Sequence, residues 1–495
     1  MLHTIQHGLL LLLLSLVSLS VSLEKPHSFD HKPIHIQSHG IQSAAQEFDR
    51  QVTILVHHIT IVTVVALPVI SEHSGRIQEE TRLEKALQKS NGKWNPDHPR
   101  YRLLNALKGY LLYKPRAIAD VDKWRKAYKK IPRKQRAFIE ANIHYSKKLN
   151  TIEHLIDTNA ELTHAIVDNA LAFYNISRRE LDAFLAETKD RDTASDAASS
   201  KTHVQQALKH FVRDWSAEGR HERDPVFPCI LHALQEEFRF PKEKDDRAAS
   251  NATTPIRVLV PGAGLGRLAH EIAALGDGRR RSFEVTTNEW SAYTNVAYRF
   301  LTTLLHPHPQ RTTITFHPFI DWLSHQRTTT SLTRPITIPD FLPPVPPPYP
   351  PSPPSPQSQV LLIEADFTTL TGTYDALITL FFIDTAANLL AYLHSIHALL
   401  RPGGVWVNAG PLLWGTGARL QLSLDEVVAL AEGVGFEFVE RRGDVVEGLC
   451  GGEVGEGEGM IQGKVRGREV PYGFDERALS RNAYLAVNWV ARRKG

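Results

Sequence analysis

Cysteine is scarce in this chain of 495 residues, which contains only Cys229 and Cys450. Two cysteines cannot build a scaffold of several disulfides or a cysteine-ligated zinc site, and their scarcity suits a reducing compartment. The 24 histidines show no metal-ligand spacing such as His-Glu-x-x-His, so we predict no metal site. The chain also lacks a large excess of positive or negative charge: its formal net charge is +3. So small a charge argues against nucleic acid as a partner.

Two hydrophobic runs lie in the first 70 residues. Gly8 to Leu23 resembles the apolar core of a signal peptide, although no Lys or Arg precedes it. Val52 to Ile70 is long enough for a marginal membrane span, but it contains two histidines and a proline. A secretory signal, a membrane anchor and a dispensable extension over residues 1–73 all stay open. We favour the extension and argue against a membrane protein, because the chemistry inferred below uses a cytosolic metabolite; we expect a cytoplasmic location, with the nucleus also open.

Residues 74–250 show a helical pattern with leucines at helical spacing. The predicted helical stretches are Arg82 to Leu112, Ala137 to Leu171 and Ser177 to Leu185. We interpret the strongly basic stretch Lys123 to Arg136 as a solvated helix face rather than a phosphate or nucleic-acid contact. The stretch Asp190 to Ser200, rich in Asp, Ala and Ser, predicts a surface loop.

Charged residues crowd around Phe211 and Trp215 in the segment from His210 to Asp224. A plain surface helix does not need this density of charge. Arg213 can hold a ligand carboxylate through its bidentate fork, or it can form a structural ion pair with a neighbouring acid.

The chain is organised around a glycine-rich turn between an apolar run and a helical pattern. Ile256 to Val260 predicts a buried strand, and Gly262, Gly264 and Gly266 follow at alternate positions. Leu268 to Leu275 then has helical spacing. Strand, glycine turn and helix open a doubly wound α/β domain, in which the turn lets a ligand approach bare backbone. A tight turn without a ligand is the alternative interpretation.

The next predicted strand, Phe283 to Asn288, ends at Glu289. This acid lies roughly 20 residues beyond the last glycine, where a carboxylate can accept hydrogen bonds from a ribose diol. The predicted ligand is therefore a cofactor that carries a nucleoside.

Two further predicted strands end at acidic residues. Val360 to Glu364 leads to Asp366 and Phe367, which can accept from the adenine amine and cover the base; a turn-capping role for the acid is the alternative. Ala376 to Phe382 leads to Asp384. Because open parallel sheets bind ligands beyond the carboxyl ends of their strands, we expect Asp384 to contact the reacting group.

The order of the remaining elements favours one class of α/β domain. After a proline-rich insertion at 327–359, strands and helices alternate until the strands Phe436 to Glu440 and Tyr484 to Ala491, one of which we expect to be antiparallel. This ending is common in S-adenosylmethionine-dependent methyltransferases and not in nicotinamide-binding domains. The fold class is therefore α/β, a Rossmann-like methyltransferase sheet with helices on both faces over residues 251–495, preceded by an all-helical region.

Five motifs resemble the carnosine N-methyltransferase family, and the resemblance extends over roughly Arg76 to Arg493. The segment from Arg213 to Asp224 also looks like the family's motif ahead of the catalytic domain. The resemblance implies transfer of a methyl group from S-adenosylmethionine to an imidazole nitrogen of carnosine, which gives anserine. The motifs are Val260-Pro-Gly-Ala-Gly-Leu-Gly-Arg-Leu-Ala269, Asn288-Glu-Trp-Ser291, Phe381-Phe-Ile-Asp-Thr-Ala386, Arg401-Pro-Gly-Gly-Val-Trp-Val-Asn408 and Gly410-Pro-Leu-Leu413.

By position, the resemblance assigns a set of residues to each ligand. The donor residues are Arg213, Gly262, Gly264, Glu289, Asp366 and Phe367, together with His210 and Leu380, where the family has glutamine and cysteine. The dipeptide residues are Asp384, Tyr472 and Tyr484. After Gly-Pro-Leu-Leu the family has Tyr-His, with the histidine in the substrate pocket, and this chain has Trp414-Gly415. That departure concerns the substrate more than methyl transfer.

Asp384 is the predicted catalytic residue. Neutral imidazole is already a nucleophile, so a carboxylate on the other ring N–H would select the reactive tautomer and stabilise the developing positive charge. Three different functions stay open beside this one: a methyltransferase that acts on histidine in another peptide or protein, a non-catalytic S-adenosylmethionine-binding protein, and a nicotinamide oxidoreductase. We expect a small-molecule dipeptide as partner, and a homodimer stays open.

Overall fold

The computed structural model describes residues 75–89, 94–189, 193–238, 255–276, 282–305, 313–340, 360–454 and 462–495. The two hydrophobic runs, and with them the predicted extension 1–73, lie outside these residues. In the described part, no helix is both long enough and apolar enough to cross a membrane.

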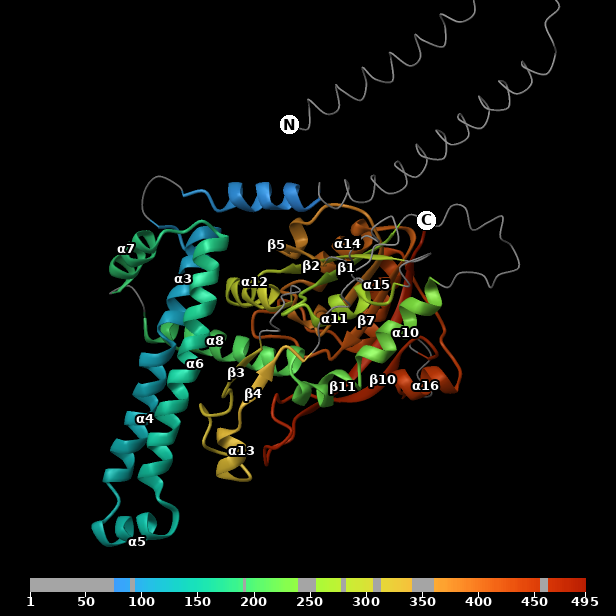
Figure 1. The fold of residues 1–495 in the computed structure, drawn as a ribbon. Helices are drawn as coiled ribbons and strands as arrows, with labels where there is room; N and C mark the ends of the chain where they lie inside the picture. Colours follow the sequence, from blue (N-terminus) through green and yellow to red (C-terminus); the bar gives the residue numbers. More distant parts are fainter. Residues whose placement is uncertain are drawn as a thin grey trace, which may run out of the picture. The chain divides into compact units, whose positions relative to one another are not determined.

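A group of helices precedes the sheet in the chain, as the spacing of the leucines predicts. They are α3 (Pro99–Leu111), α4 (Tyr113–Lys129), α5 (Arg133–Ile143), α6 (Tyr145–Phe173), α7 (Arg178–Thr188), α8 (Ala194–Trp215), α9 (Arg220–Arg223) and α10 (Phe227–Glu237). The long helices α4 and α6 lie side by side, and α5 connects them at one end (Figure 1). Leu149, Ile152 and Ile156 are buried along α6, because residues three and four apart share one face of a helix.

The predicted loop over Asp190 to Ser200 is wrong for residues 194–200, which form the first turns of α8. Thr193 caps this helix: its Oγ1 accepts the Asp196 N–H at 3.1 Å, and Asp196 Oδ2 accepts the Thr193 N–H at 3.0 Å. This capping box and the alanines that follow favour a helix over the polar loop that the composition indicates.

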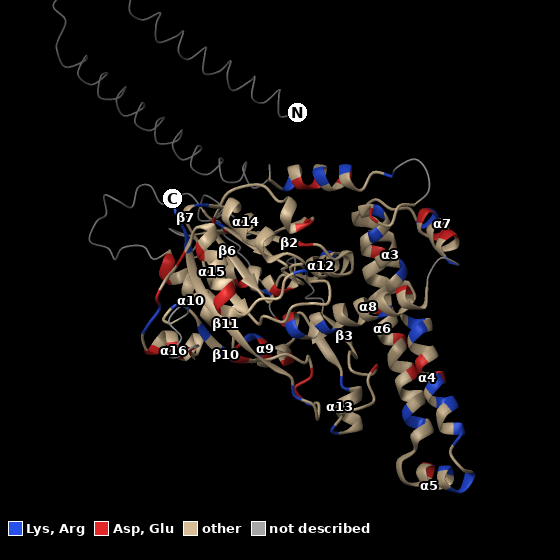
Figure 2. Cartoon of the chain, turned by 180° about the vertical axis from the view of Figure 1, so that it is seen from behind, with Lys and Arg blue, Asp and Glu red and all other residues tan. Residues whose placement is uncertain are grey.

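The basic stretch Lys123 to Arg136 lies on α4 and α5. Figure 2 shows Lys and Arg along these two helices, and every lysine of the stretch is exposed. No residue of α5 is buried. The structure therefore agrees with the interpretation of this stretch as a solvated face.

A mixed sheet follows, with the order β5-β2-β1-β6-β7-β11-β10-β9 and with β8 paired to the far end of β11. Its strands are β1 (Ile256–Pro261), β2 (Phe283–Glu289), β5 (Val360–Glu364), β6 (Tyr374–Leu380), β7 (Leu400–Gly410), β8 (Phe436–Phe438), β9 (Gly452–Glu453), β10 (Arg466–Pro471) and β11 (Ala483–Arg493). From β5 to β7 each strand is parallel to its neighbour. β11 is antiparallel to β7, β8 and β10. The predicted antiparallel strand at the end of the chain is thus confirmed.

Helices cover both faces of this sheet. They include α11 (Arg267–Ala273), α12 (Ala292–Leu305), α14 (Leu389–Leu399), α15 (Leu424–Val434) and α16 (Asp444–Cys450). Val258 and Val260 of β1 share a core with α10 and α11, whereas Leu259 shares a core with α14 and α15. The alternation follows from the two-residue period of a strand. The predicted Rossmann-like fold class is confirmed.

Helix α12 joins the helical region to the sheet. It packs against α3, α6 and α8. Leu104 of α3, Phe211 of α8 and Leu301 of α12 are fully buried in one hydrophobic cluster. The helical region therefore contributes to the same core as the element that follows Glu289.

The first part of the predicted proline-rich insertion is folded. Residues 327–340 contain α13 (Thr329–Thr333) and β4 (Ile336–Ile338), and β4 pairs with β3 (Ile314–Phe316). Ile336 and Ile338 are buried because they alternate on one face of β4. The proline cluster itself lies outside the described residues.

The two cysteines form a single disulfide, Cys229–Cys450, which links α10 to α16. Both residues are buried. One bridge of this kind is compatible with the exclusion of a scaffold of several disulfides, but it does not match the expectation of a reducing compartment, where disulfides are rare. It joins segments that are 221 residues apart in sequence.

Asp340 connects the helical region to the helix behind the glycine turn. Its Oδ2 lies 2.9 Å from Nη2 of Arg223, and its Oδ1 lies 2.6 Å from Nη1 of Arg267. The two arginine side chains are 4% and 8% exposed. A carboxylate between two buried guanidinium groups compensates charges that water does not reach.

We expect Asp340→Ala to lower the free energy of unfolding by about 3–5 kcal/mol, because buried Arg223 loses its carboxylate partner and buried Arg267 is left with its pair with Glu271. Urea-induced unfolding followed by circular dichroism measures the change. Asp157→Ala is the matched control, since Asp157 pairs with Lys114 at the surface and such pairs contribute less than about 1 kcal/mol. Equal losses for the two variants would contradict the compensating role of Asp340.

Candidate active site

Glycines with positive φ form the turn between β1 and α11. Gly262, Gly264 and Gly266 have φ angles of 59°, 58° and 74°, a region that side chains disfavour. A Cβ at Gly262 would lie 2.3 Å from Cδ2 of Phe382, whereas one at Gly264 would meet no atom closer than 3.5 Å. Gly262 therefore permits close packing on Phe382, and Gly264 presents its backbone to the polar groups described next.

Glu289, at the end of β2, is bound to this turn. The Gly264 N–H donates to Oε2 of Glu289 at 3.1 Å, and the Ser291 N–H donates to Oε1 at 2.8 Å. Burial raises the pKa of Glu289, and these backbone donors partly oppose the increase. Each carboxylate oxygen has two lone pairs, so the acid retains acceptor capacity for a ribose diol.

The C-terminal end of α8 lies against Gly264. Arg213 donates from Nε to Asp214 Oδ1 at 2.7 Å and from Nη2 to His210 Nδ1 at 3.2 Å. A Cβ at Gly264 would be 3.5 Å from His210 Nδ1 and 3.6 Å from Arg213 Nη2. The predicted donor residues His210, Arg213, Gly264 and Glu289 are thus brought together.

At this end of α8, Arg213 and Asp214 are charged and His210 is neutral. Burial, followed by the Arg213 charge, lowers the pKa of His210 to about 3, so the imidazole is neutral. Burial also acts against the charged form of Arg213, but Asp214 outweighs it and raises the arginine pKa. Of the two interpretations of Arg213, the structure contains the ion pair with Asp214, while the guanidinium remains beside Gly264.

Asp366, Phe367 and Leu380 lie at the ends of β5 and β6 and have contacts of their own. Asp366 Oδ1 accepts from the backbone N–H and the hydroxyl of Thr368, at 2.8 and 2.6 Å, so the acid does cap a turn. Phe367 is 4% exposed and packs edge-on against Phe382, with 5.2 Å between ring centroids. Leu380 is the last residue of β6. Their contacts with the donor stay predictions.

Asp384 lies just beyond β6, in a 3-10 turn that spans Ile383–Thr385. It is 7% exposed, and its Oδ2 accepts the Leu413 N–H at 3.1 Å. Burial raises the pKa of Asp384, and the hydrogen bond from Leu413 opposes the increase. The segment after β7 therefore holds this carboxylate in place, while its other lone pairs can accept from a ligand.

Tyr472 and Tyr484 lie together around Phe381. The Phe381 ring stacks on Tyr472 with centroids 5.2 Å apart, and Tyr484 lies 5.4 Å from Tyr472. Phe474 is also 5.4 Å from Tyr472, and we call these four residues the aromatic cluster. Phe381 has a φ of 50°, a strained conformation for a residue other than glycine and one often found at functional sites. Because Phe381 precedes Asp384 by three residues, the cluster borders the end of β6.

Phe474 connects the aromatic cluster to the group at Gly264. Its ring stacks on His210 with centroids 5.7 Å apart, and Arg213 Cζ lies 5.8 Å from the ring centroid. The predicted donor residues and the predicted substrate residues thus form neighbouring parts of one site.

Several residues of this site were not predicted from the sequence. Phe474 carried no signal, and Phe381 appeared only as the first residue of a family motif, because their positive φ angles and ring contacts depend on the tertiary fold. Cζ of Arg102, on α3, lies 3.5 Å from the ring centroid of Trp290, the residue that follows Glu289 in the sequence. A contact across 188 positions in sequence leaves no local pattern that would reveal it.

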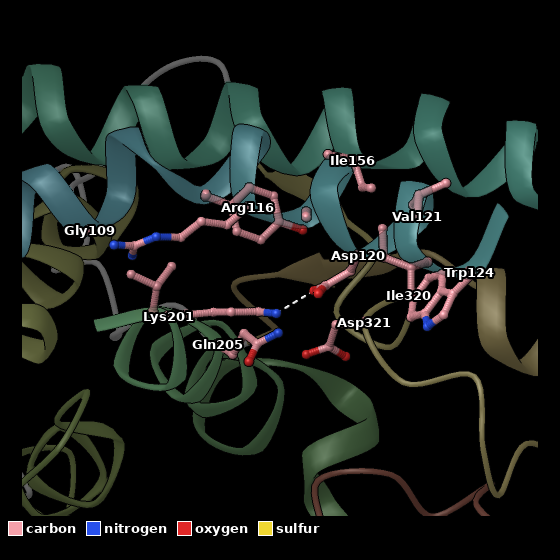
Figure 3. A pocket seen from close by; sticks show the side chains of 13 residues that line it. Gly109, Arg116, Asp120, Val121, Trp124, Ile156, Lys201, Gln205, Ile320 and Asp321 are labelled. Carbon is pink, nitrogen blue, oxygen red and sulfur yellow. Dashed lines mark hydrogen bonds and ion pairs between the residues drawn. The ribbon is translucent and has the colours of Figure 1, made fainter. Parts of the chain in front are cut away.

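A separate, small pocket lies between α4, α6 and α8 (Figure 3). An ion pair between Lys201 and Asp120 crosses it, and Asp321 also lines it. None of the predicted site residues is among its lining residues.

The described residues also lack a cluster of metal ligands. Among them, no group of three or more His, Cys, Asp and Glu side chains is arranged to hold a metal ion.

The order and direction of the strands define the class of this protein. Five parallel strands run in the order β5-β2-β1-β6-β7, and an antiparallel strand, β11, follows β7. This is the arrangement of a Rossmann-like methyltransferase.

The chain belongs to the carnosine N-methyltransferase family, because the sequence profile of that family matches residues 190–495. The resemblance found in the motifs is therefore confirmed. The chain is a methyltransferase, and S-adenosylmethionine is its methyl donor.

Similar sequences carry the name of the same family. The carnosine N-methyltransferase of Rattus norvegicus is 31% identical over 306 residues, 59% of this chain and 67% of the rat protein. That of Schizosaccharomyces pombe is 27% identical over 360 residues, 68% of this chain and 87% of the yeast protein. Among solved structures, a magnesium protoporphyrin IX methyltransferase from Synechocystis is 11% identical, with a TM-score of 0.28 over 59% of this chain and 87% of that one.

Proposed function

We propose that this chain transfers the methyl group of S-adenosylmethionine to an imidazole nitrogen of carnosine, β-alanyl-histidine, and so produces anserine. The observation that carries the proposal is a nearly buried carboxylate, Asp384, beside the aromatic cluster at the end of β6. An acceptor of this kind fits the N–H of a neutral imidazole, and the rings fit its planar faces.

The residues at the glycine turn fit the methyl donor. Glu289 can accept from a ribose diol, and Arg213 supplies a guanidinium for a carboxylate. Gly264 has no side chain between these two groups. When bound, S-adenosylmethionine supplies the electrophilic methyl group.

The protein's own task is to orient the imidazole and to stabilise charge. Asp384 accepts a hydrogen bond from one ring N–H, which leaves the lone pair of the other nitrogen free to attack. As positive charge develops on the ring, the fixed carboxylate stabilises it without reorganisation. Tyr472 and Tyr484 restrict the orientation of the substrate.

The proposal is tested by incubation of the full chain with deuterated S-adenosylmethionine and carnosine, followed by mass spectrometry of the small-molecule fraction. We expect deuterated anserine, and the assay with Asp384→Asn serves as the control for background transfer. If carnosine stays unmethylated while the protein binds the donor, carnosine is not the substrate.

A histidine in another peptide or protein is the second candidate substrate. A Cβ at Gly415 would meet no atom within 4 Å, so space is open where the family is expected to carry its substrate-pocket histidine. The neighbouring Trp414 side chain is held by a hydrogen bond, which its Nε1–H donates to the Leu422 carbonyl at 2.8 Å. The same labelled donor added to cell extract, with small-molecule and protein fractions counted separately, distinguishes the two substrates.

Donor binding without catalysis and nicotinamide chemistry have less support. A protein that only binds the donor has no need for Asp384, and a nicotinamide oxidoreductase does not account for the antiparallel strand β11. Because the reaction uses a cytosolic metabolite, the proposal includes a cytoplasmic location.

A further inference from the structure

Glu222 is a buried acid that the reaction described above does not use. It lies on the short helix α9 and is 4% exposed. Its Oε1 accepts the N–H groups of Gly473 and Phe474, at 2.9 and 2.5 Å. Its Oε2 is excluded from solvent and has no hydrogen-bond partner. A buried carboxylate oxygen without a donor is costly, and such an atom in a native site calls for a ligand or another partner.

The two N–H groups on Glu222 belong to the loop that carries the aromatic cluster. Tyr472 stands directly before Gly473, and its own N–H donates to the Asn482 carbonyl at 2.9 Å. Phe474 follows, with a φ of 61°. Glu222 therefore holds the backbone of the loop between the two rings through Oε1, and Oε2 of the same carboxylate is left without a hydrogen bond.

Nearby cationic side chains have acidic partners other than Oε2 of Glu222. Arg213 pairs with Asp214, and Arg223 pairs with Asp340 and donates to backbone carbonyls. His221 lies 3.5 Å from Oε1, the oxygen already in use. Within the described ranges, Oε2 of Glu222 accepts no hydrogen bond, so this oxygen has the capacity to bind a positively charged group of a ligand.

We propose that Oε2 of Glu222 binds an aliphatic primary ammonium group, with the rings of Tyr472 and Phe474 beside it. A carboxylate supplies a charge-assisted hydrogen bond, and aromatic faces attract the same cation. This inference rests on the proposed function, because the amino end of the β-alanyl group in carnosine is the expected source of the ammonium. The methionine part of the donor carries the same group and is the second source.

The test uses the full chain with Glu222→Gln. Glutamine keeps the shape and one oxygen for the N–H groups of Gly473 and Phe474, but it removes the charge. Carnosine is compared with N-acetylcarnosine, in which acetylation abolishes the positive charge. We expect the wild type to prefer carnosine, and the variant to lose roughly 10- to 100-fold in kcat/KM for carnosine with little change for the acetylated dipeptide. The loss should lie in KM rather than in kcat.

Asp224→Asn is the matched control, because it removes an acid two residues away that is exposed at the end of α9. It should leave the preference for carnosine unchanged. Calorimetry provides a readout that does not depend on turnover: carnosine is titrated into the protein with S-adenosylhomocysteine bound, and S-adenosylhomocysteine is titrated separately.

The outcomes separate the sources of the ammonium group. Weaker carnosine binding by Glu222→Gln with unchanged S-adenosylhomocysteine binding assigns the subsite to the dipeptide. A tenfold or greater loss of S-adenosylhomocysteine affinity alone assigns it to the amino group of the donor. Unchanged binding of both ligands overturns the inference. If the wild-type protein binds carnosine without methylating it, the proposed function is contradicted. The binding data for Glu222→Gln still show whether Glu222 holds the ammonium group.

Discussion

Replacement of Asp384 by asparagine is expected to lower kcat by at least about a hundredfold and to leave the affinity for S-adenosylmethionine nearly unchanged. Asparagine keeps an oxygen for the Leu413 N–H, so the local backbone retains its hydrogen bond. What is lost is the negative charge that faces the imidazole as positive charge develops on it. Steady-state kinetics and donor calorimetry on the same preparation measure the two effects.

Stability provides an independent check on Asp384→Asn. Burial raises the pKa of this carboxyl, so the folded protein binds its proton more tightly than the unfolded chain does. Stability is therefore lost as pH rises from about 3.9, the value of a free Asp, through the raised pKa of the folded state. Since asparagine has no such charge, the variant should be more stable than the wild type at pH 8, and the difference should vanish in acid.

Asp157→Asn is the control for both measurements, because Asp157 is half exposed on α6. It should change neither kcat nor the pH dependence of unfolding. Unchanged turnover in Asp384→Asn would remove this residue from the mechanism, even if the stability change occurs as expected.

Replacement of Glu289 by glutamine is expected to weaken S-adenosylhomocysteine binding on the order of a hundredfold, since hydrogen bonds to a charged acceptor contribute about 1.5–3 kcal/mol each. Both oxygens of Glu289 accept backbone N–H groups, so the amide NH₂ of glutamine would have to face a donor. The substitution therefore has two effects: it disturbs the turn at Gly264, and it weakens the hydrogen bonds that the side chain accepts from the ribose diol. Calorimetry measures the dissociation constant.

Glu284→Gln is the matched control, because Glu284 lies at the other end of the same strand, β2. Its effect on affinity should be less than threefold. If Glu289→Gln binds S-adenosylhomocysteine as tightly as the wild type, the nucleoside is not bound through this acid.

The sheet was predictable because its strands are buried on both faces. Such strands appear as continuous apolar runs, and Ile256 to Val260 and Phe283 to Asn288 correspond within one residue to β1 and β2. The acids beyond the strand ends were equally visible, since parallel strands direct their carboxyl ends to one edge. The positions of Glu289 and Asp384 follow from that rule, and the spacing of Gly262, Gly264 and Gly266 indicated the turn.

Composition was misleading where a few local contacts decide the structure. Residues 194–200 look like a loop by composition, yet one capping box starts α8 there. Residues 327–340 adjoin a proline cluster, yet Ile336 and Ile338 alternate and pair with β3. Propensity alone does not register a single cap or a short strand pairing.

The contacts across the site were not predictable from the sequence. Arg213 meets Gly264 only because α8 packs beside the turn, and Phe474 reaches His210 only because Glu222 holds its loop. These contacts join segments that are 51 to 264 positions apart, so no periodic pattern encodes them. The family resemblance supplied some of these residues, but not the geometry that joins them.

The most direct test of the proposed chemistry is a crystal structure of the full chain with S-adenosylhomocysteine and carnosine bound. We expect ribose hydroxyls within hydrogen-bond distance of Glu289 and an imidazole N–H on Asp384, with the other ring nitrogen directed at the donor sulfur. A nucleoside bound away from the turn at Gly264, or an imidazole without contact to Asp384, would contradict it.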